Sequence, residues 1–415
     1  MDFVLYLVFK FLYFMKNMST VHLSSRDLGA VVLYTPPQHI DTFVWLEKER
    51  GIEQVYVRTM ELAKTAQRLL SPIPTLFLQK ILVPLLKNRV PGISIAIIKR
   101  ARIAWCHTFG VKNSQTQDTV CENTIFEAAS LSKPVFAYGI FKLIEKGILE
   151  LDRPLVDYLP RTSIEVEDER INLITARIVL THTTGFPNWR PRDKALAIHF
   201  QPGERFSYSG EGFAFLQKVL EHVTSTHIDT YFREQVFVPL RMNHSTFEWV
   251  FGPDKASGHD SEGVPLKNPS GLSPNAAFTL HTNARDYARF MVAIMRGNGL
   301  QATTVNEMLQ PCVPVRKGCV GCLSLEGRVH PLSSTVSWGL GWGIQRTSIG
   351  DSFWHWGDNG CFKNFVVGFQ NHHSGVVAFS NSENGLRALS EVISSITHLS
   401  LPAVEWLESA GAFER

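Results

Sequence analysis

The stretch that decides the fold is residues 126–160, which read FEAASLSKPVFAYGIFKLIEKGILELDRPLVDYLP. From Ser130 to Ile144 nearly every position is apolar, and Gly147 follows as a natural end for a helix. A helix that is apolar on almost all sides is one that lies buried in the middle of a protein. The stretch therefore predicts a central, buried helix that begins at Ser130 and ends before Gly147.

The start of this predicted helix reads Ser130-Leu131-Ser132-Lys133. Residues i and i+3 share one face of a helix, so the serine and lysine side chains can touch. A serine hydroxyl is a poor nucleophile unless a neighbour takes its proton, and burial can lower a lysine pKa from about 10.4 far enough for that task. The backbone N–H at a helix start has no helical partner and lies at the positive end of the dipole. The pattern indicates a nucleophilic Ser130, activated by Lys133, whose own N–H is half of an oxyanion hole.

Taken alone, this motif is compatible with a second interpretation, a serine N-cap followed by a solvated lysine. Lys133 is the only one of the 17 lysines with a serine three residues before it. The neighbouring sequence decides between the two interpretations.

The segments on both sides of the helix predict an antiparallel sheet. Residues 76–88 have an amphipathic helical pattern, residues 92–98 read as a buried strand, and residues 103–110 return as its hairpin partner. Residues 150–310 alternate helical segments with Pro and Gly loops, and a final helix is expected at about 386–399. Four late segments have strand composition: SWGLGWGIQ (337–345), DSFWHWG (351–357), FKNFVVGF (362–369) and GVVAFSN (375–381). The prediction is an α/β fold, an antiparallel sheet flanked by helices with an inserted all-helical lobe.

The two ends of the chain are assigned differently. Residues 1–70 are predicted to be an N-terminal extension of unknown role with one or two helices within 41–70, residues 76–400 the main domain, and 401–415 a C-terminal tail. The first fifteen residues, MDFVLYLVFKFLYFM, are strongly apolar but short for a bilayer span. Asp2 and the lack of a small-residue cleavage pattern are atypical of a secretory signal, and an interfacial segment and a signal-like segment both stay open. Membrane contact through residues 1–15 stays open, and the cell envelope or a membrane is slightly favoured over the cytoplasm.

The composition excludes several function classes. Hydrophobic residues make up 44% and charged residues 19% of the chain, and the net charge of +3 gives no basic footprint for nucleic acid. No metallopeptidase, Walker A, dinucleotide-binding or nucleophile-elbow motif is present, and no metal or organic cofactor is required. The cysteines are too scattered for a disulfide scaffold. The C-x-x-C motif of Cys319 and Cys322 lacks the further ligands of a zinc site, so we expect both residues to be free thiols in a loop.

Residues 126–160 resemble the start of the helical lobe in the β-lactamase-related serine hydrolases. That superfamily includes class C β-lactamases, D-alanyl-D-alanine carboxypeptidases and β-lactamase-fold esterases. Further similar blocks follow in the same order: ITARIVLTHTTGFPNW (174–189), QPGERFSYSGEGFAFLQKVLE (201–221), FVPLRMNHSTF (237–247) and DSFWHWGDNGCFKNF (351–365). The resemblance covers about residues 76–400. It implies a β-lactamase-like fold and a hydrolase acting on a small-molecule or peptide-like substrate.

By position, the resemblance implies that Ser130 is the acylated nucleophile and Lys133 its general base or proton relay. Tyr208, in Tyr208-Ser209-Gly210, stands where the family has its Tyr-x-Asn motif. Its phenol would share a proton with Ser130 and Lys133 and deliver it to the leaving group. Whether the lysine or the tyrosine is the formal base differs within the family and stays open.

The segment His355-Trp356-Gly357 takes the place of the Lys-Thr-Gly strand that lines the family's active site. Asp358, which follows Gly357, would supply the second oxyanion N–H from its backbone. A second interpretation of His355 is a packed histidine between two tryptophans. The other histidines, including His182, are interpreted as structural.

Two positions depart from the family pattern. Gly210 replaces an Asn that holds the substrate amide, and His355 replaces a Lys that binds the β-lactam carboxylate. A histidine of ordinary pKa, about 6.5, is mostly neutral near pH 7 and would become a cation below about pH 6.5. Both changes favour an esterase or D-amino-acid-type peptidase over efficient antibiotic hydrolysis. The alternative is a binding or assembly protein of the same fold that recognises cell-wall-like ligands, or acylates only slowly.

Overall fold

The computed structural model describes residues 30–33, 42–49, 52–58, 75–163, 166–267, 271–316, 318–321, 323 and 335–413. The chain divides into two units, Met1–Lys87 and Asn88–Arg415. In the first unit, β1 (Ala30–Leu33), β2 (Thr42–Glu49) and β3 (Ile52–Arg58) form an antiparallel sheet, and helix α3 spans Thr75–Lys87. Residues 1–15 lie outside the described residues. Among the helices that are described, none has both the length and the apolar character that a bilayer span needs.

The prediction of helices within residues 41–70 is wrong for the part that the structure describes. Residues 42–49 and 52–58 are strands paired with each other. Their sequences, TFVWLEKE and IEQVYVR, contain several β-branched and aromatic residues, which favour strands over helices. The mixed charge of the segment concealed this composition.

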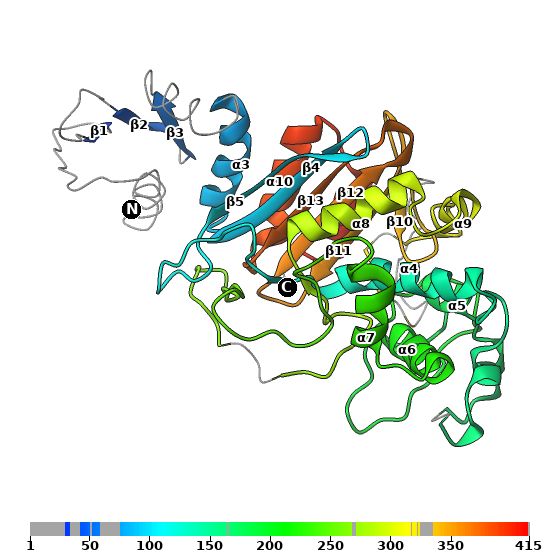
Figure 1. Ribbon diagram of the computed structural model, residues 1–415. Helices are drawn as coiled ribbons and strands as arrows, with labels where there is room; N and C mark the ends of the chain where they lie inside the picture. The colour runs from blue at the N-terminus through cyan, green and yellow to red at the C-terminus, as the bar shows by residue number, and fades with distance from the viewer. Residues whose placement is uncertain are drawn as a thin grey trace. The chain divides into compact units, whose positions relative to one another are not determined.

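The second unit is built on an eight-stranded antiparallel sheet with the strand order β5-β4-β13-β12-β11-β10-β9-β8 (Figure 1). The strands are β4 (Gly92–Lys99), β5 (Arg102–Gly110), β8 (Val313–Pro314), β9 (Val336–Trp338), β10 (Gly343–Thr347), β11 (Gly350–Asp358), β12 (Lys363–Phe369) and β13 (Ser374–Ser380). Pairing of β4 with β13 joins the early hairpin to the late strands, which confirms the predicted single sheet. A short separate sheet pairs β6 (Phe126–Glu127) with β7 (His281–Thr282).

Helices cover this sheet, because its central strands carry apolar residues on both faces. Helix α8 (Ala284–Arg296) packs against β4, β5 and β13, and α10 (Gly385–Thr397) packs against β12 and β13 (Figure 1). Helix α11 (Pro402–Ser409) packs against β9 and β10. The sequence assigned residues 401–415 to a tail, whereas α11 buries Ala403, Trp406 and Leu407.

A helical lobe lies at one end of the sheet, beside α4 (Ser132–Glu145) (Figure 1). Its elements are the helices α5 (Ala176–Leu180), α6 (Gly210–Thr224) and α7 (Ile228–Phe232), the π-turn η5 (Arg233–Phe237), and the 3-10 turns η2 (Leu155–Tyr158), η3 (Arg161–Ser163) and η4 (Glu169–Leu173). Helix α9 (Ala302–Met308) and the turn η6 (Gln370–His372) complete the unit. The inserted all-helical lobe that the sequence predicted is present.

The central helix α4 begins two residues later than predicted. It starts at Ser132, and the residues before it, Ala129–Leu131, form the 3-10 turn η1. Of its 14 residues, 11 are buried, including Val135, Phe136 and Phe141. The uninterrupted apolar pattern therefore predicted the burial of the helix correctly.

Residues 337–345 are two strands rather than the single strand that the sequence predicted. Strand β9 ends at Trp338 and β10 begins at Gly343, and these two residues face each other in the antiparallel pair. Between them Gly341 has a φ of +86°, and a Cβ there would lie 2.4 Å from the Cβ of Ala137. A glycine is required for this turn against α4. Alternating glycines are compatible with a strand and with a turn, so the pattern alone was ambiguous.

The cysteines differ in part from the prediction. Cys319 is disulfide-bonded, so the expectation of a free thiol there is wrong. Cys106, Cys121, Cys312 and Cys361 are free, and Cys322 lies outside the described residues. Within the described ranges, no group of three or more His, Cys, Asp or Glu side chains is arranged to hold a metal ion.

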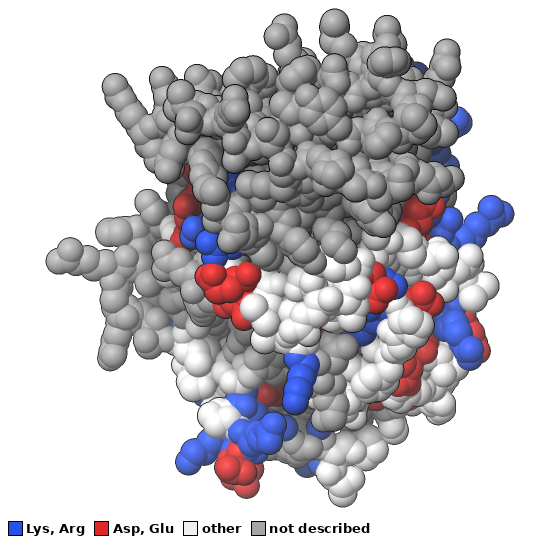
Figure 2. Space-filling view, turned by 90° about the vertical axis from the view of Figure 1, so that its left-hand side faces the viewer, with Lys and Arg blue, Asp and Glu red and all other residues white. Residues whose placement is uncertain are grey.

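The described part of the surface in Figure 2 carries basic and acidic side chains mixed together around a band of uncharged residues. This distribution agrees with the small net charge of +3. Neither sign dominates the described atoms of this face.

Candidate active site

Ser130 and Lys133 meet at the start of α4. Ser130 lies in η1 and is partly exposed, whereas Lys133 lies in the first turn of α4 and is buried. The Nζ atom of Lys133 is 3.1 Å from Oγ of Ser130 and donates a hydrogen bond of 2.9 Å to the carbonyl oxygen of Ala277. The spacing of three residues therefore brings the two side chains together, although Ser130 precedes the α-helix itself.

Burial changes the chemistry of this lysine. The pKa of Lys133 is lowered well below 10.5, because burial removes water from its charged form. One N–H of the amine donates a hydrogen bond to the Ala277 carbonyl. A neutral amine in this place has a lone pair that can accept the proton of Ser130.

Tyr208 lies beside Lys133, whose Nζ is 4.6 Å from the centroid of the phenol ring. Burial raises the pKa of Tyr208 well above 10, and the neighbouring Ser130 hydroxyl offsets part of this rise. Among the described residues the Tyr208 hydroxyl has no partner in full hydrogen-bond geometry. The phenol therefore keeps its proton near neutral pH and lies where it can donate that proton.

His182 holds Tyr208 in place, a contact that the sequence analysis did not foresee. The two rings stack with centroids 4.1 Å apart, and the N–H of Ser209 donates to Nδ1 of His182 at 3.0 Å. Acceptance at Nδ1 places the ring proton on Nε2. The pKa of His182 is lowered well below 6.5 by burial first, and then by Lys133 and His355. His182 is thus a neutral ring that supports Tyr208 and the residue after it.

His355 is fully buried on β11. Its ring centroid lies 5.3 Å from those of Trp338 and Trp356 and 6.2 Å from that of Tyr208. Its Nδ1 is 2.6 Å from the carbonyl oxygen of Trp356. Burial, and to a lesser extent Lys133, lowers the pKa of His355 to about 3. The expectation that His355 becomes a cation below about pH 6.5 is therefore wrong.

Gly357 allows β11 to approach the nucleophile segment. A Cβ at Gly357 would lie 2.3 Å from the carbonyl oxygen of Ala128, two residues before Ser130. Only glycine permits this contact. Asp358 follows on the same strand, and its carboxylate pairs with Lys363 at 3.2 Å. The end of β11 and the start of η1 therefore lie against each other, as an oxyanion hole built from both would need.

A buried ion pair anchors the backbone before Ser130. One Glu127 carboxylate oxygen lies 2.9 Å from Nζ of Lys255, and the other accepts a 2.9 Å hydrogen bond from Nδ2 of Asn359. Asn359 is the residue after Asp358. The Glu127 side chain therefore connects the segment that carries Ser130 to the turn after β11. Removal of Glu127 or of Lys255 alone would leave the other as an unpaired buried charge.

The residue before the nucleophile has a strained backbone. Ala129 has a φ of +51°, a left-handed conformation that costs a non-glycine residue about 1–2 kcal/mol. Ser132 compensates for this strain, because its hydroxyl donates to the Ala129 carbonyl at 2.6 Å and accepts the Leu280 N–H at 2.9 Å. Strain of this kind persists only where the surroundings fix it, and it gathers at functional sites.

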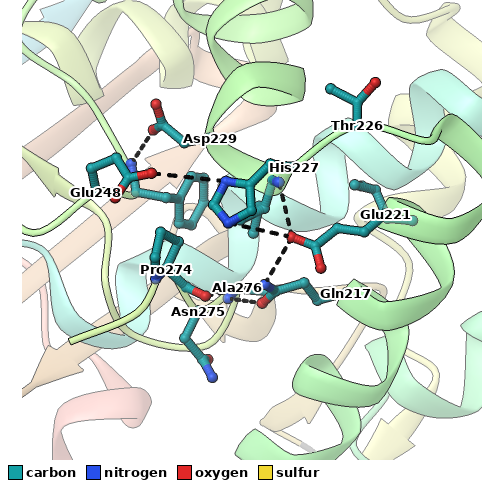
Figure 3. A network of polar contacts seen from close by, with 12 residues as sticks. Gln217, Glu221, Thr226, His227, Asp229, Glu248, Pro274, Asn275 and Ala276 are labelled. Carbon is teal, nitrogen blue, oxygen red and sulfur yellow. Dashed lines mark hydrogen bonds and ion pairs between the residues drawn. The ribbon is translucent and has the colours of Figure 1, made fainter. Parts of the chain in front are cut away.

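Figure 3 shows the network that holds the segment leading to the Ala277 carbonyl. The side-chain amide of Gln217, on α6, donates to the carbonyl of Pro274 at 3.1 Å and accepts the N–H of Ala276 at 2.8 Å. Both ends of the turn before Ala277 are thus fixed by one side chain. Because Ala277 accepts a hydrogen bond from Lys133, Gln217 supports the lysine from the helical lobe.

Glu221 extends this network along α6. It accepts hydrogen bonds from Gln217 at 3.3 Å and from the N–H of Ile228 at 3.0 Å (Figure 3). His227 lies between two carboxylates, 3.9 Å from Glu221 and 3.8 Å from Glu248. These contacts fix the start of α7 relative to α6.

Gly210 is the first residue of α6 and lies under the indole of Trp189. A Cβ at Gly210 would be 2.5 Å from a ring carbon of Trp189. The resemblance predicted only that an amide contact is lost at this position. In the structure, an aromatic ring fills the space in which a larger side chain would lie.

Several known proteins are similar to this chain in sequence. The family model described as Beta-lactamase matches residues 67–393. Protein flp of Staphylococcus aureus (strain MW2) is 26% identical over 211 residues, which cover 47% of this chain and 42% of that protein. Penicillin-binding protein 4* of Bacillus subtilis (strain 168) is 21% identical over 326 residues, 72% of this chain and 69% of that protein. The chain thus spans less than half the length of the Staphylococcus relative.

Solved structures also share the fold. The octameric penicillin-binding protein homologue from Pyrococcus abyssi has a TM-score of 0.64 and 24% identity, over 81% of this chain and 79% of that one. D-alanine carboxypeptidase AmpC from Burkholderia cenocepacia has a TM-score of 0.63 and 19% identity, over 78% of this chain and 97% of that one. With the family model, these matches confirm the β-lactamase-like fold that the sequence predicted.

Proposed function

The chain belongs to the beta-lactamase family, and on this basis we propose that it hydrolyses an ester or amide through an acyl-enzyme at Ser130, as an esterase or D-amino-acid-type peptidase. The family supports serine hydrolase activity in general. The observation that carries the finer proposal is the 3.1 Å contact between the buried Lys133 amine and the Ser130 hydroxyl. A lysine deprived of water beside a serine has the properties of a general base.

In the acylation step, neutral Lys133 takes the proton of Ser130 as Oγ attacks the substrate carbonyl carbon. The new C–O bond forms while the carbonyl π electrons move to the oxygen. We assign the backbone N–H groups of Ser130 and Asp358 to the oxyanion. Support for this assignment is the close approach of β11 to η1 at Gly357. Preorganised donors of this kind are commonly the largest contribution to such catalysis.

In the next step the bond to the leaving group breaks, and that group needs a proton. Tyr208 retains its proton because burial raises its pKa, so it donates to the departing oxygen or nitrogen. The proton that Lys133 holds then returns to Tyr208. Water attacks the acyl-enzyme in the second half-reaction, with the same groups acting in reverse.

Substrate preference is the first test of this proposal. We expect kcat/KM for short p-nitrophenyl esters to exceed that for benzylpenicillin and for a cephalosporin by about 10²-fold or more, since two or three hydrogen bonds worth roughly 0.5–3 kcal/mol each are missing. Gly210 has no side-chain amide to offer, and His355 is neutral. Steady-state kinetics on one enzyme preparation measure the ratio. A cephalosporin hydrolysed faster than every ester tried would contradict the proposal.

The pH dependence of this preference is the second test. A histidine with a pKa near 3 is neutral throughout the range from about pH 5 to about pH 8, so His355 supplies no cation for a substrate carboxylate there. We expect the ratio of kcat/KM for a carboxylate-bearing ester to that for a neutral ester to stay constant over this range. Lys133 and Tyr208 affect both substrates alike and cancel in the ratio. An increase of the ratio below about pH 6.5 would mean that His355 titrates as an exposed histidine does.

A further inference from the structure

Trp189 is fixed beside the candidate active site by its neighbours in the chain. The Asn188 backbone carbonyl accepts the N–H groups of Gly210 and Glu211 at 3.0 and 3.1 Å, and its side-chain oxygen also accepts the Gly210 N–H, at 2.9 Å. On the other side, the N–H of Arg190 donates to the Glu211 carboxylate at 3.0 Å. The backbone on both sides of Trp189 is therefore bound to the first turn of α6, which begins two residues after Tyr208.

The indole of Trp189 lies between two parts of this site. On one side it covers Gly210, where a Cβ would be 2.5 Å from the ring. On the other side it meets Phe278 edge to face, with ring centroids 5.4 Å apart. Phe278 follows Ala277, the residue whose carbonyl accepts a hydrogen bond from Lys133. Trp189 and Phe278 together therefore form an aromatic surface between the start of α6, two residues after Tyr208, and the segment whose carbonyl binds Lys133.

This aromatic surface is open to a ligand. Trp189 is 45% exposed, a large fraction for a tryptophan whose backbone is fixed on both sides. Fixed aromatic side chains bind apolar groups at a low cost in conformational entropy. In the family, the side-chain amide of an Asn lies at position 210. Here the backbone N–H of Gly210 is the nearest polar group in the chain, and it is already bound by Asn188. The surface is thus suited to rings and alkyl chains rather than to an acylamide.

We propose that Trp189 and Phe278 bind the acyl part of the substrate, and that the enzyme prefers esters of aromatic or long-chain apolar carboxylic acids. This inference rests on the proposed hydrolase function. In this enzyme the two rings take the place of the amide-holding contact of the family, so the acyl group is the part of the substrate that sets the preference.

The experiment compares p-nitrophenyl phenylacetate with p-nitrophenyl acetate, two esters with the same leaving group. For the full chain we expect kcat/KM to favour the phenylacetyl ester. Trp189→Ala should lower kcat/KM for the phenylacetyl ester by about 10- to 100-fold and that for the acetyl ester by less than about 3-fold, the scale of a lost apolar contact in a specificity pocket. Trp189→Phe should retain most of the preference. Ile349→Ala removes another exposed apolar side chain, in the turn between β10 and β11, and serves as the matched control.

Labelling of Ser130 by a fluorophosphonate separates the two proposals. If the full chain is not labelled and hydrolyses neither ester, the hydrolase function itself fails. If the full chain and Trp189→Ala are labelled equally and the ester ratio does not change, the hydrolase function stands and the aromatic acyl site is wrong. Labelling also shows that the Trp189→Ala protein is folded at its active site.

A second variant restores the family residue. Because the ring of Trp189 occupies the space beside Gly210, an asparagine fits there only after the ring is removed. Trp189→Ala/Gly210→Asn should raise kcat/KM for the p-nitrophenyl ester of N-benzoylglycine, an acylamido acid, by about 10-fold over Trp189→Ala, the worth of one or two hydrogen bonds. Gly210→Asn alone should lower it. Equal effects of the asparagine with and without Trp189 would refute the proposal that the ring takes the place of the amide contact.

Discussion

Ser130→Ala is expected to abolish both ester hydrolysis and labelling by serine-directed probes. Loss of a covalent nucleophile leaves only the catalysis due to binding and the oxyanion hole, so kcat should fall by about 10⁴-fold or more. The reason lies in the geometry of η1, which holds the Ser130 hydroxyl 3.1 Å from a buried amine. Turnover of p-nitrophenyl acetate and incorporation of a fluorophosphonate are the two measurements.

Two controls make the Ser130 result specific. Ser390→Ala, on α10, removes a partly exposed hydroxyl that donates to the Arg387 carbonyl of its own helix, and it should leave turnover and labelling unchanged. Peptide mapping of the labelled protein separates Ser130 from Ser132, whose hydroxyl is bound to the backbone of Ala129 and Leu280. More than a few per cent of activity in Ser130→Ala would show that the nucleophile is another residue. Labelling of Ser130 without turnover would favour the slowly acylating binding protein.

The main elements of the fold could be predicted because local patterns specify them. The hairpin of the buried strand β4 and its partly exposed edge partner β5, the central helix α4 and the late strands β11 to β13 each have an apolar pattern bounded by glycine or a turn residue. The errors lie where local pattern is ambiguous. Residues 42–58 have charges that suit a helix and β-branched residues that suit a strand, and tertiary pairing decides between the two. The glycines at 339, 341 and 343 could mark a strand or a turn, and contact with Ala137 selects the turn.

The candidate site shows the same division. The contact between Ser130 and Lys133 follows from helical periodicity and could be predicted from four residues of sequence. The supports of the site are contacts between distant parts of the chain. Gln217 binds the backbone of Ala276, 59 residues away, and the Ala277 carbonyl that meets Lys133 is backbone, which no side-chain pattern reveals. The low pKa of His355 also depends on burial by tryptophans from separate strands. The ordinary pKa of a histidine therefore gave the wrong prediction of its charge at low pH.

Lys133 and Tyr208 are expected to act as one unit with Ser130. Lys133→Ala and Tyr208→Phe should each lower kcat by about 10²–10⁴-fold, the range for a positioned acid or base. The double variant should be far less than additive, because each residue depends on the other to complete the same proton path. In the unaltered protein kcat/KM should rise with pH as Lys133 loses its proton, since only the neutral amine can act as the base. The lowered pKa of Lys133 places this rise well below pH 10.5.

The controls must separate lost chemistry from lost structure, because Lys133 is buried and its removal leaves a cavity. Lys133→Met keeps most of the volume without the amine, and it should be as inactive as Lys133→Ala but more stable to heat. Lys142→Ala removes a partly exposed lysine from the same helix, whose Nζ contacts the Gly299 carbonyl at 3.4 Å and the ring of Tyr138, and it should change kcat by less than about twofold, because neither contact involves Ser130 or Tyr208. If the effects of Lys133→Ala and Tyr208→Phe multiply fully in the double variant, the two side chains do not share a proton. The 4.6 Å approach of the amine to the phenol ring would then be packing alone, and Tyr208 would have to be removed from the proposed mechanism.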